Sequence, residues 1–214
     1  MSEIDYQTTY WDRVASEKTF THPFQMDDFN QVVPIDSKIL DYGCGYGRTC
    51  AALKENGYKD VVGVDTSLEM IKRGLASHSQ LDLRHIESAS LPFPDEFFTA
   101  CTLMAVLTCI PTDPGQEAVI AEIQRVLKPE GILFVSDYPL QADARNQKRY
   151  NLHKSEFGTF GVFRLPDGGV VRHHDMDWIY ELLSRFARIR EFRLDVSTMN
   201  GNKASIFQII AQKN

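Results

Sequence analysis

The chain has 214 residues, 43% of them hydrophobic, which is enough for one sizeable core and at most a small appended region. Its 23 basic and 29 acidic residues give a net charge of -6, which argues against nucleic acid as a partner because a phosphate backbone would be repelled. No early stretch has the pattern of a signal peptide and no run is apolar enough to span a membrane, so a soluble, cytoplasmic protein is expected.

Apolar runs of strand length alternate with segments of helical period up to residue 138, a pattern typical of an α/β domain with a mainly parallel sheet. In chain order the sequence predicts a strand at 38–41, a helix at 48–56, a strand at 60–65, a helix capped by Thr66 or Ser67, strands near 81–86 and within 97–107, a helix from 114 to a Pro-Glu-Gly stop at 129–131, and a strand at 132–138. Beyond Pro139 it predicts a polar segment, a hairpin around 165–169, a helix through 178–186 and a final antiparallel hairpin at 187–212.

The stretch "ILDYGCGYGR" at 39–48 places three glycines directly after the first strand. In an open α/β sheet such glycines permit a tight bend and close approach of a ligand, although a tight turn alone would also explain them. Asp65 ends the second strand about twenty residues later, where a carboxylate can accept hydrogen bonds from both hydroxyls of a ribose or can cap the next helix. The two features together indicate an adenosine-containing cofactor.

The loop spacing distinguishes between such cofactors. It is G-x-G-x-G, not the G-x-G-x-x-G of dinucleotide-binding turns, which present a helix N-terminus to a pyrophosphate. Asp41 lies just before the loop, where it suits a cationic amine better than a pyrophosphate. The sequence therefore favours S-adenosylmethionine, which carries an ammonium and a sulfonium and no phosphate. The alternatives are an NAD(P)-dependent Rossmann oxidoreductase and a cofactor-binding regulatory protein without turnover.

Residues 35–138 resemble the core of the class I S-adenosylmethionine-dependent methyltransferases. The resemblance rests on four segments in the family's order, "ILDYGCGYGR", "VVGVDTSLEMI", "ESASLPFPDEFFTACTLMAVL" and "IQRVLKPEGILFVSDY". It implies a Rossmann-like, doubly wound seven-stranded sheet with a terminal antiparallel hairpin. It also implies one methyltransferase domain over 1–214, composed of an N-terminal lid at 1–30, a cofactor-binding core at 35–138, an acceptor-side insertion at 139–175, and a C-terminal helix and hairpin at 176–214.

The resemblance further implies which residues bind the cofactor. The methionine portion would lie along the glycine loop, formed by Asp41, Gly43, Cys44, Gly45, Gly47 and Arg48. Asp65 would hold the ribose, and the residues near the ribose and adenine would be Thr66, Ser67, Met70, Glu87, Ser88 and Ala89. The family commonly has an aspartate where this sequence has Glu87. The segment facing the methyl donor would be Met104, Ala105 and Val106, and the lid would supply aromatic cover from Tyr10 and Trp11. Met70, the segment 104–106 and the two lid aromatics can equally be packing residues.

The implied reaction is an in-line displacement that moves a methyl group to a small-molecule acceptor, carried out by a monomer or homodimer. Such a reaction needs a general base only when the acceptor must lose a proton. In the acceptor-side insertion, strand alternation directs His173 and His174 to opposite faces, so one of them can orient the acceptor or take its proton, unless both are structural. Histidines that face apart make poor joint ligands and the four cysteines contain no Cys-x-x-Cys pair, so no metal is expected.

Overall fold

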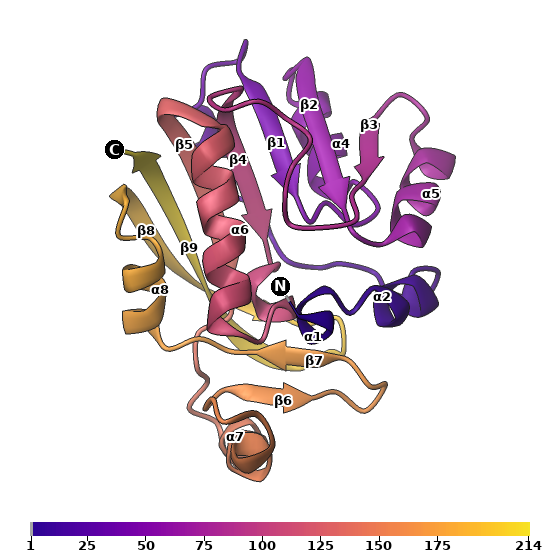
Figure 1. Ribbon diagram of the computed structural model, residues 1–214, viewed down its shortest axis with the longest axis vertical. Coiled ribbons are helices and arrows are strands. Elements are labelled where there is room, and N and C mark those ends of the chain that lie inside the picture. The colour runs from indigo at the N-terminus through magenta and orange to yellow at the C-terminus, as the bar shows by residue number, and fades with distance from the viewer. Residues whose placement is uncertain (1) are drawn as a thin grey trace.

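A seven-stranded sheet forms the centre of the protein in this computed structural model, which describes residues 2–214 (Figure 1). The strand order is β3-β2-β1-β4-β5-β9-β8. Strands β1 to β5 pair in parallel, whereas β9 runs antiparallel to both β5 and β8. The strands are β1 (Lys38–Tyr42), β2 (Asp60–Asp65), β3 (Asp82–His85), β4 (Phe98–Met104), β5 (Leu127–Asp137), β8 (Phe186–Ser197) and β9 (Lys203–Lys213).

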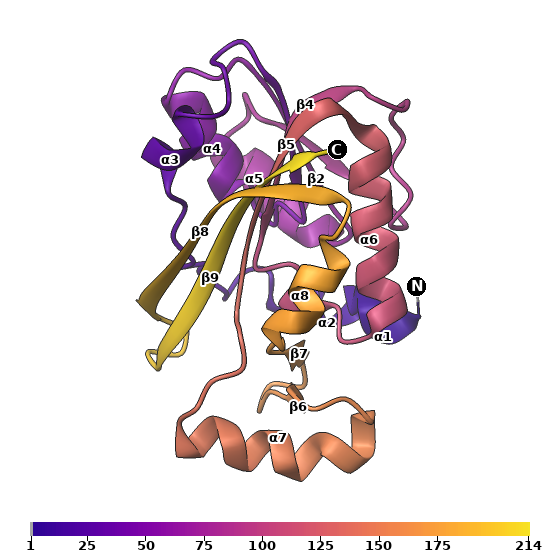
Figure 2. The same cartoon turned by 90° about the vertical axis from the view of Figure 1, so that its left-hand side faces the viewer.

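Helices cover both faces of the sheet (Figure 2). On one face lie α3 (Met26–Asn30), α4 (Arg48–Glu55) and α5 (Leu68–Ser77), and on the other lie α6 (Asp113–Val126) and α8 (Met176–Leu182). Each face has its own apolar core, because Leu53 and Ile71 pack in one cluster and Ile120 and Ile123 in the other. The predicted fold class, including the terminal hairpin of β8 and β9, is confirmed.

The boundary between α6 and β5 differs from the prediction. The helix ends at Val126, and β5 begins at once with Leu127, before the Pro-Glu-Gly sequence that was expected to separate them. Leu127 pairs with Phe98 of β4, and a shift of register follows. Residues 128–130, which follow the buried Leu127, are exposed, so this part of β5 has no apolar run that would predict a strand. The predicted helix through 178–186 is also shorter, since Phe186 already belongs to β8.

The polar segment after Pro139 contains a helix that the sequence did not predict, α7 (Ala144–Phe157). Asp143 caps its N-terminus by accepting a hydrogen bond from Asn146 N at 3.1 Å, and Gly158 ends it with a positive φ of 72°. Among its residues only Asn146 and Tyr150 are buried, so the helix has no apolar stripe that a periodicity search could detect.

A further layer lies beyond the carboxyl ends of the parallel strands, at the bottom of Figure 1. It comprises α1 (Glu3–Tyr6), α2 (Thr8–Val14), the 3-10 turn Leu107–Cys109, α7, and a separate hairpin of β6 (Val162–Arg164) and β7 (Val170–Arg172). The Gln7 side chain joins its parts, because it donates to Cys109 O and Val170 O and accepts from Val170 N. Within residues 2–214, no helix has both the length and the apolar character needed to cross a bilayer.

Candidate functional site

A cavity lies between the carboxyl ends of the central strands and this additional layer. Its lining residues surround about 1700 Å³ of empty space, a figure that includes the open solvent at its mouth. Ligands of open α/β sheets bind in this position, beyond the carboxyl ends of the strands. The cavity therefore lies where a ligand of this fold binds, and its lining extends from the glycine loop to α7 and the β6–β7 hairpin.

The glycine loop forms one wall of the cavity. Gly43 and Gly45 both line it, and both adopt a positive φ, of 69° and 56°. Neither position has space for a side chain. A Cβ atom at Gly43 would lie 2.5 Å from a methyl group of Val106, and a Cβ atom at Gly45 would overlap the ring of Phe20. Both the backbone conformation and the close packing therefore require glycine here.

Asp65 is held by two backbone groups at the adjacent wall. Its Oδ2 accepts a hydrogen bond from Gly45 N at 2.7 Å, and its Oδ1 accepts one from Ser67 N at 2.8 Å. Burial raises the pKa of Asp65, whereas these two N–H donors favour the charged form and oppose that shift. Each carboxylate oxygen keeps a lone pair for a further donor. The side chain thus offers two acceptor atoms, which is what a ribose diol requires.

Asp41 provides a second carboxylate in the same half of the cavity. It is only 1% exposed and accepts hydrogen bonds from Thr102 Oγ1 at 2.6 Å and from Cys50 Sγ at 3.3 Å. Burial raises its pKa to about 6, while the two hydrogen bonds and the nearby Arg48 favour the charged form. Arg48 also lines the cavity and donates to the backbone oxygen of His22, which ties the N-terminal segment to the loop.

The N-terminal segment lines the cavity with four Tyr, Trp and Phe side chains, namely Tyr6, Tyr10, Trp11 and Phe20. The Tyr10 and Trp11 ring centroids are 5.0 Å apart, and those of Trp11 and Phe20 are 6.3 Å apart. Phe20 stacks on Tyr46 of the glycine loop, and the Tyr10 hydroxyl donates to Asp167 in the β6–β7 turn. The two aromatics predicted from sequence are thus at the cavity. Phe20 was not predicted, because nothing in its local sequence links it to the loop.

Most of the other predicted cofactor residues also line the cavity: Cys44, Thr66, Met70, Met104, Ala105 and Val106. Ala105 has a positive φ of 55°, which is uncommon for a residue with a side chain. Its N–H donates to Ser136 O at 2.7 Å, so the turn after β4 is fixed against the end of β5.

Five predicted residues lie outside the lining of the cavity: Gly47, Ser67, Glu87, Ser88 and Ala89. Gly47 is the N-cap residue of α4 and faces β3, where an added Cβ would lie 2.9 Å from Leu83. Ser67 caps α5 and donates from its hydroxyl to Asp12 of α2. Residues 87 and 88 are exposed to solvent, and the residue of this segment that lines the cavity is the neighbouring Ile86.

The two adjacent histidines have different surroundings, as strand alternation predicts. His173 lines the cavity, and its Nδ1 lies 2.5 Å from the hydroxyl of Tyr150. His174 is fully buried elsewhere, with Nδ1 bonded to Tyr138 O and Nε2 to the amide of Gln116. Burial lowers the pKa of both, to about 3 for His174. In the described part of the chain, no group of three or more His, Cys, Asp or Glu side chains is arranged to hold a metal ion.

The distal half of the cavity, away from the glycine loop, is formed by Tyr138, Arg145, Arg149, Phe163 and His173. Two of these, Arg145 and Arg149, come from α7, and no motif in the sequence points to them. The β8–β9 turn adds Asn200 and Asn202 to the same lining. His22 also lines the cavity. Its Nε2 lies 2.7 Å from Ser136 Oγ, and its buried Nδ1 has no hydrogen-bond partner within residues 2–214.

Comparison with known proteins identifies the family. Residues 40–135 match the family model described as "Methyltransferase domain". A solved S-adenosylmethionine-dependent methyltransferase of Methanosarcina mazei superposes with a TM-score of 0.83 at 26% identity, covering 90% of this chain and 99% of that chain.

Curated relatives match over shorter segments. A ubiquinone biosynthesis O-methyltransferase of Xylella fastidiosa is 34% identical over 150 residues, which are 63% of this chain and 58% of that protein. A tRNA (carboxymethyluridine(34)-5-O)-methyltransferase of Arabidopsis thaliana is 32% identical over 108 residues, 50% of this chain and 26% of that protein. The matched segments cover between 26% and 58% of the length of these curated relatives, so the chain spans only part of each of them. The oxidoreductase alternative finds no support in these similarities. The chain belongs to the class I S-adenosylmethionine-dependent methyltransferases, and S-adenosylmethionine is the cofactor of that family.

Proposed function

We propose that this protein transfers the methyl group of S-adenosylmethionine to a small-molecule acceptor. The observation that carries the proposal is the Gly45–Asp65 pair at the cavity wall, where a side-chain-free loop adjoins a carboxylate with two free lone pairs. A ribose diol needs such a carboxylate, and a cationic methionine portion needs a negatively charged loop without steric bulk, which Asp41 and Gly43 supply. The residues present thus fit the cofactor.

The cofactor supplies an electrophilic methyl group on a sulfonium. The task of this chain is to align the two reactants and to keep water out, because displacement at carbon requires the nucleophile in line with the leaving group. We assign Asp65 to the ribose, and the glycine loop with Asp41 to the methionine portion. The aromatic rings of Tyr10, Trp11 and Phe20 cover the site against solvent.

We assign the acceptor to the distal half of the cavity, with His173 and not His174 at the acceptor, since only His173 lines the cavity. A small molecule fits the net charge of -6 better than a nucleic acid does. The acceptors named for the relatives differ in class, so they do not transfer to this chain. The free thiols of the cysteines suit a reducing compartment, and we place the protein in the cytoplasm as a monomer or homodimer.

Two measurements test the proposal. Calorimetry should show binding of S-adenosylhomocysteine and no comparable binding of NAD, and failure to bind S-adenosylhomocysteine would refute the cofactor assignment. Release of S-adenosylhomocysteine from S-adenosylmethionine in the presence of an acceptor panel then tests turnover. Binding without release for any acceptor would point to the regulatory alternative.

A further inference from the structure

We infer that the methyl acceptor carries an anionic group of the carboxylate type, and that Arg149 and His173 bind this group in the distal half of the cavity. The inference rests on the proposed methyl transfer and adds the chemical class of the acceptor.

Arg149 is a half-buried cation without a counterion. Its guanidinium lies 3.6 Å from the ring centroid of Phe163, which holds it at the cavity lining. Its Nε is buried without a hydrogen-bond partner, and no carboxylate of residues 2–214 forms an ion pair with it. Burial accordingly lowers its pKa. By contrast Arg172, which is more deeply buried, pairs with Asp113 at 2.5 Å. A desolvated arginine normally has an anionic partner. Arg149 has none in the described part of the chain, and a ligand bound in the cavity can supply it.

His173 presents an N–H donor beside Arg149. The Tyr150 hydroxyl accepts a hydrogen bond from Gln141 N at 3.2 Å and lies 2.5 Å from His173 Nδ1. We take the single hydroxyl hydrogen to be donated to Nδ1, and with this assignment the hydrogen of the neutral imidazole is on Nε2. Burial, followed by the charge of Arg149, holds the pKa of His173 well below its usual 6.5, so the ring is neutral at pH 7. Within residues 2–214 no group bonds to Nε2.

Aromatic and aliphatic side chains form the walls next to this pair. Tyr138 stacks on the His173 ring with centroids 5.4 Å apart, and Phe163 meets the same ring edge-on at 5.1 Å. Leu165 and Val171 of the β6–β7 hairpin complete this part of the lining. A ligand with an apolar body and one carboxylate matches such walls, whereas a strongly polar ligand would leave its other groups unpaired.

The charged side chains of the cavity are distributed unevenly between its two halves, which also favours an anion in the distal half. Asp41 and Asp65 lie in the half with the glycine loop together with one cation, Arg48, which donates to His22 O, whereas Arg145 and Arg149 lie in the distal half. The carboxylate near these arginines is Asp143, which is 3.9 Å from Arg145 and accepts from Asn146 N as the cap of α7. Because Asp143 is half-exposed, water screens its charge, and the distal half keeps a positive potential toward a ligand.

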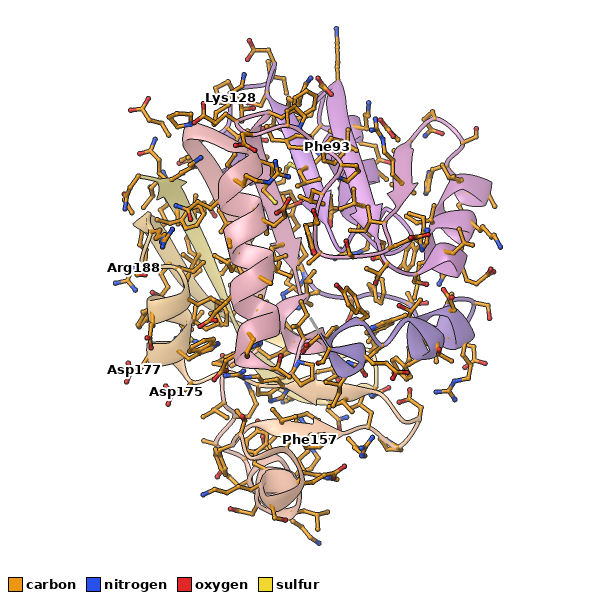
Figure 3. The ribbon with its side chains drawn as sticks, viewed as in Figure 1. Phe93, Lys128, Phe157, Asp175, Asp177 and Arg188 are labelled. Atoms are coloured by element: carbon orange, nitrogen blue, oxygen red, sulfur yellow. The ribbon has the colours of Figure 1, made fainter. Side chains whose placement is uncertain are left out.

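Paired probes test the inference on the full chain saturated with S-adenosylhomocysteine. Benzoate, phenylacetate and hexanoate are compared by calorimetry with their primary amides, which have nearly the same shape without the charge. The variants are Arg149→Met, Arg149→Lys and, as matched control, Arg188→Met. Arg188 also lies over an aromatic ring, with its guanidinium 4.5 Å from Tyr180, but it points outward from β8, far from α7 (Figure 3).

At least one carboxylate should bind about tenfold or more tightly than its amide, because a charge-assisted pair is lost in the amide. Arg149→Met should remove that preference, Arg149→Lys should keep part of it, and Arg188→Met should keep all of it. Amides that bind as well as carboxylates, absence of carboxylate binding to the wild type, or an unchanged preference in Arg149→Met would each overturn the inference. The affinity for S-adenosylhomocysteine is measured on the same proteins. If S-adenosylhomocysteine binds but the carboxylates do not, only this inference fails, whereas absence of S-adenosylhomocysteine binding means that the proposed function fails.

Discussion

The backbone N–H of Gly45 donates a 2.7 Å hydrogen bond to Oδ2 of Asp65, which joins the loop after β1 to the end of β2. The two cofactor contacts that the sequence predicts separately are therefore one physical unit. The carboxylate fixes the loop conformation, and the loop N–H favours the charged form of the carboxylate. A change at either residue should disturb both.

Asp65→Ala should weaken binding of S-adenosylhomocysteine by about 1.5–3 kcal/mol, the range for hydrogen bonds to a charged group. It removes the ribose acceptor and also leaves Gly45 N and Ser67 N without their present partner. Calorimetry measures the effect, with circular dichroism to verify folding. The matched control is Asp60→Ala at the exposed start of β2, whose 3.5 Å ion pair with Lys38 has little energetic weight. If the two variants bind S-adenosylhomocysteine with equal affinity, Asp65 serves only to cap the next helix and does not contact the ribose.

Gly45→Val should abolish S-adenosylhomocysteine binding in a protein that still folds. The new side chain would overlap Phe20 and would occupy a backbone conformation with positive φ, so either the loop or the aromatic cover must move. Gly158→Val separates the two causes. Gly158 has a similar φ of 72° and nothing within 4 Å of an added Cβ, so this variant is destabilised by backbone strain and not by a steric clash. Retained affinity in Gly45→Val, or an equal loss in Gly158→Val, would disprove the steric explanation.

The glycine-loop half of the site could be predicted because its chemistry is local in sequence. Asp41, Gly43 and Gly45 follow one strand, and Asp65 ends the next, so parallel pairing of β1 and β2 alone brings them to one edge. Glu87 shows the limit of this reasoning. Its position in the sequence pattern predicts an adenine contact, but Glu87 is exposed after β3 and Ile86 lines the cavity.

The distal half could not be predicted because its residues meet only through tertiary packing. Arg149 belongs to a helix whose few inward residues, Asn146 and Tyr150, carry no apolar periodicity. Phe163 and His173 reach it from the β6–β7 hairpin and its end. The sequence does place His173 and His174 on opposite sides, but only the structure identifies which one lines the cavity.

His173→Asn should raise the KM of the acceptor about tenfold or more and change kcat much less. With the tautomer assigned above, Nε2 of His173 carries the hydrogen, so this residue donates to the acceptor and does not take its proton. Steady-state release of S-adenosylhomocysteine separates the two constants. A loss confined to kcat, of about a hundredfold, would identify His173 as a general base and contradict this tautomer. His174→Gln is the control, and both of its constants should stay within about twofold of the wild type.

His174 should make the folded state less stable as the pH falls. Its folded-state pKa is lowered to about 3 from the ordinary 6.5, because burial opposes the charge and the positive charge of Arg172 lies nearby. Below about pH 6.5 the unfolded chain binds a proton that the folded chain does not. The free energy of unfolding therefore decreases between pH 6.5 and pH 3, by about 1.4 kcal/mol per pH unit for this one group.

Comparison of the wild type with His174→Gln isolates this contribution, since His22 has a similarly low pKa and remains in both proteins. Urea unfolding at a series of pH values gives the two slopes. Glutamine has no group that titrates in this range, so the variant should lose stability less steeply between pH 6.5 and pH 4, whatever its stability at pH 7. Parallel curves would mean that His174 accepts its proton in the folded protein, and the buried, neutral His174 described above would then be wrong.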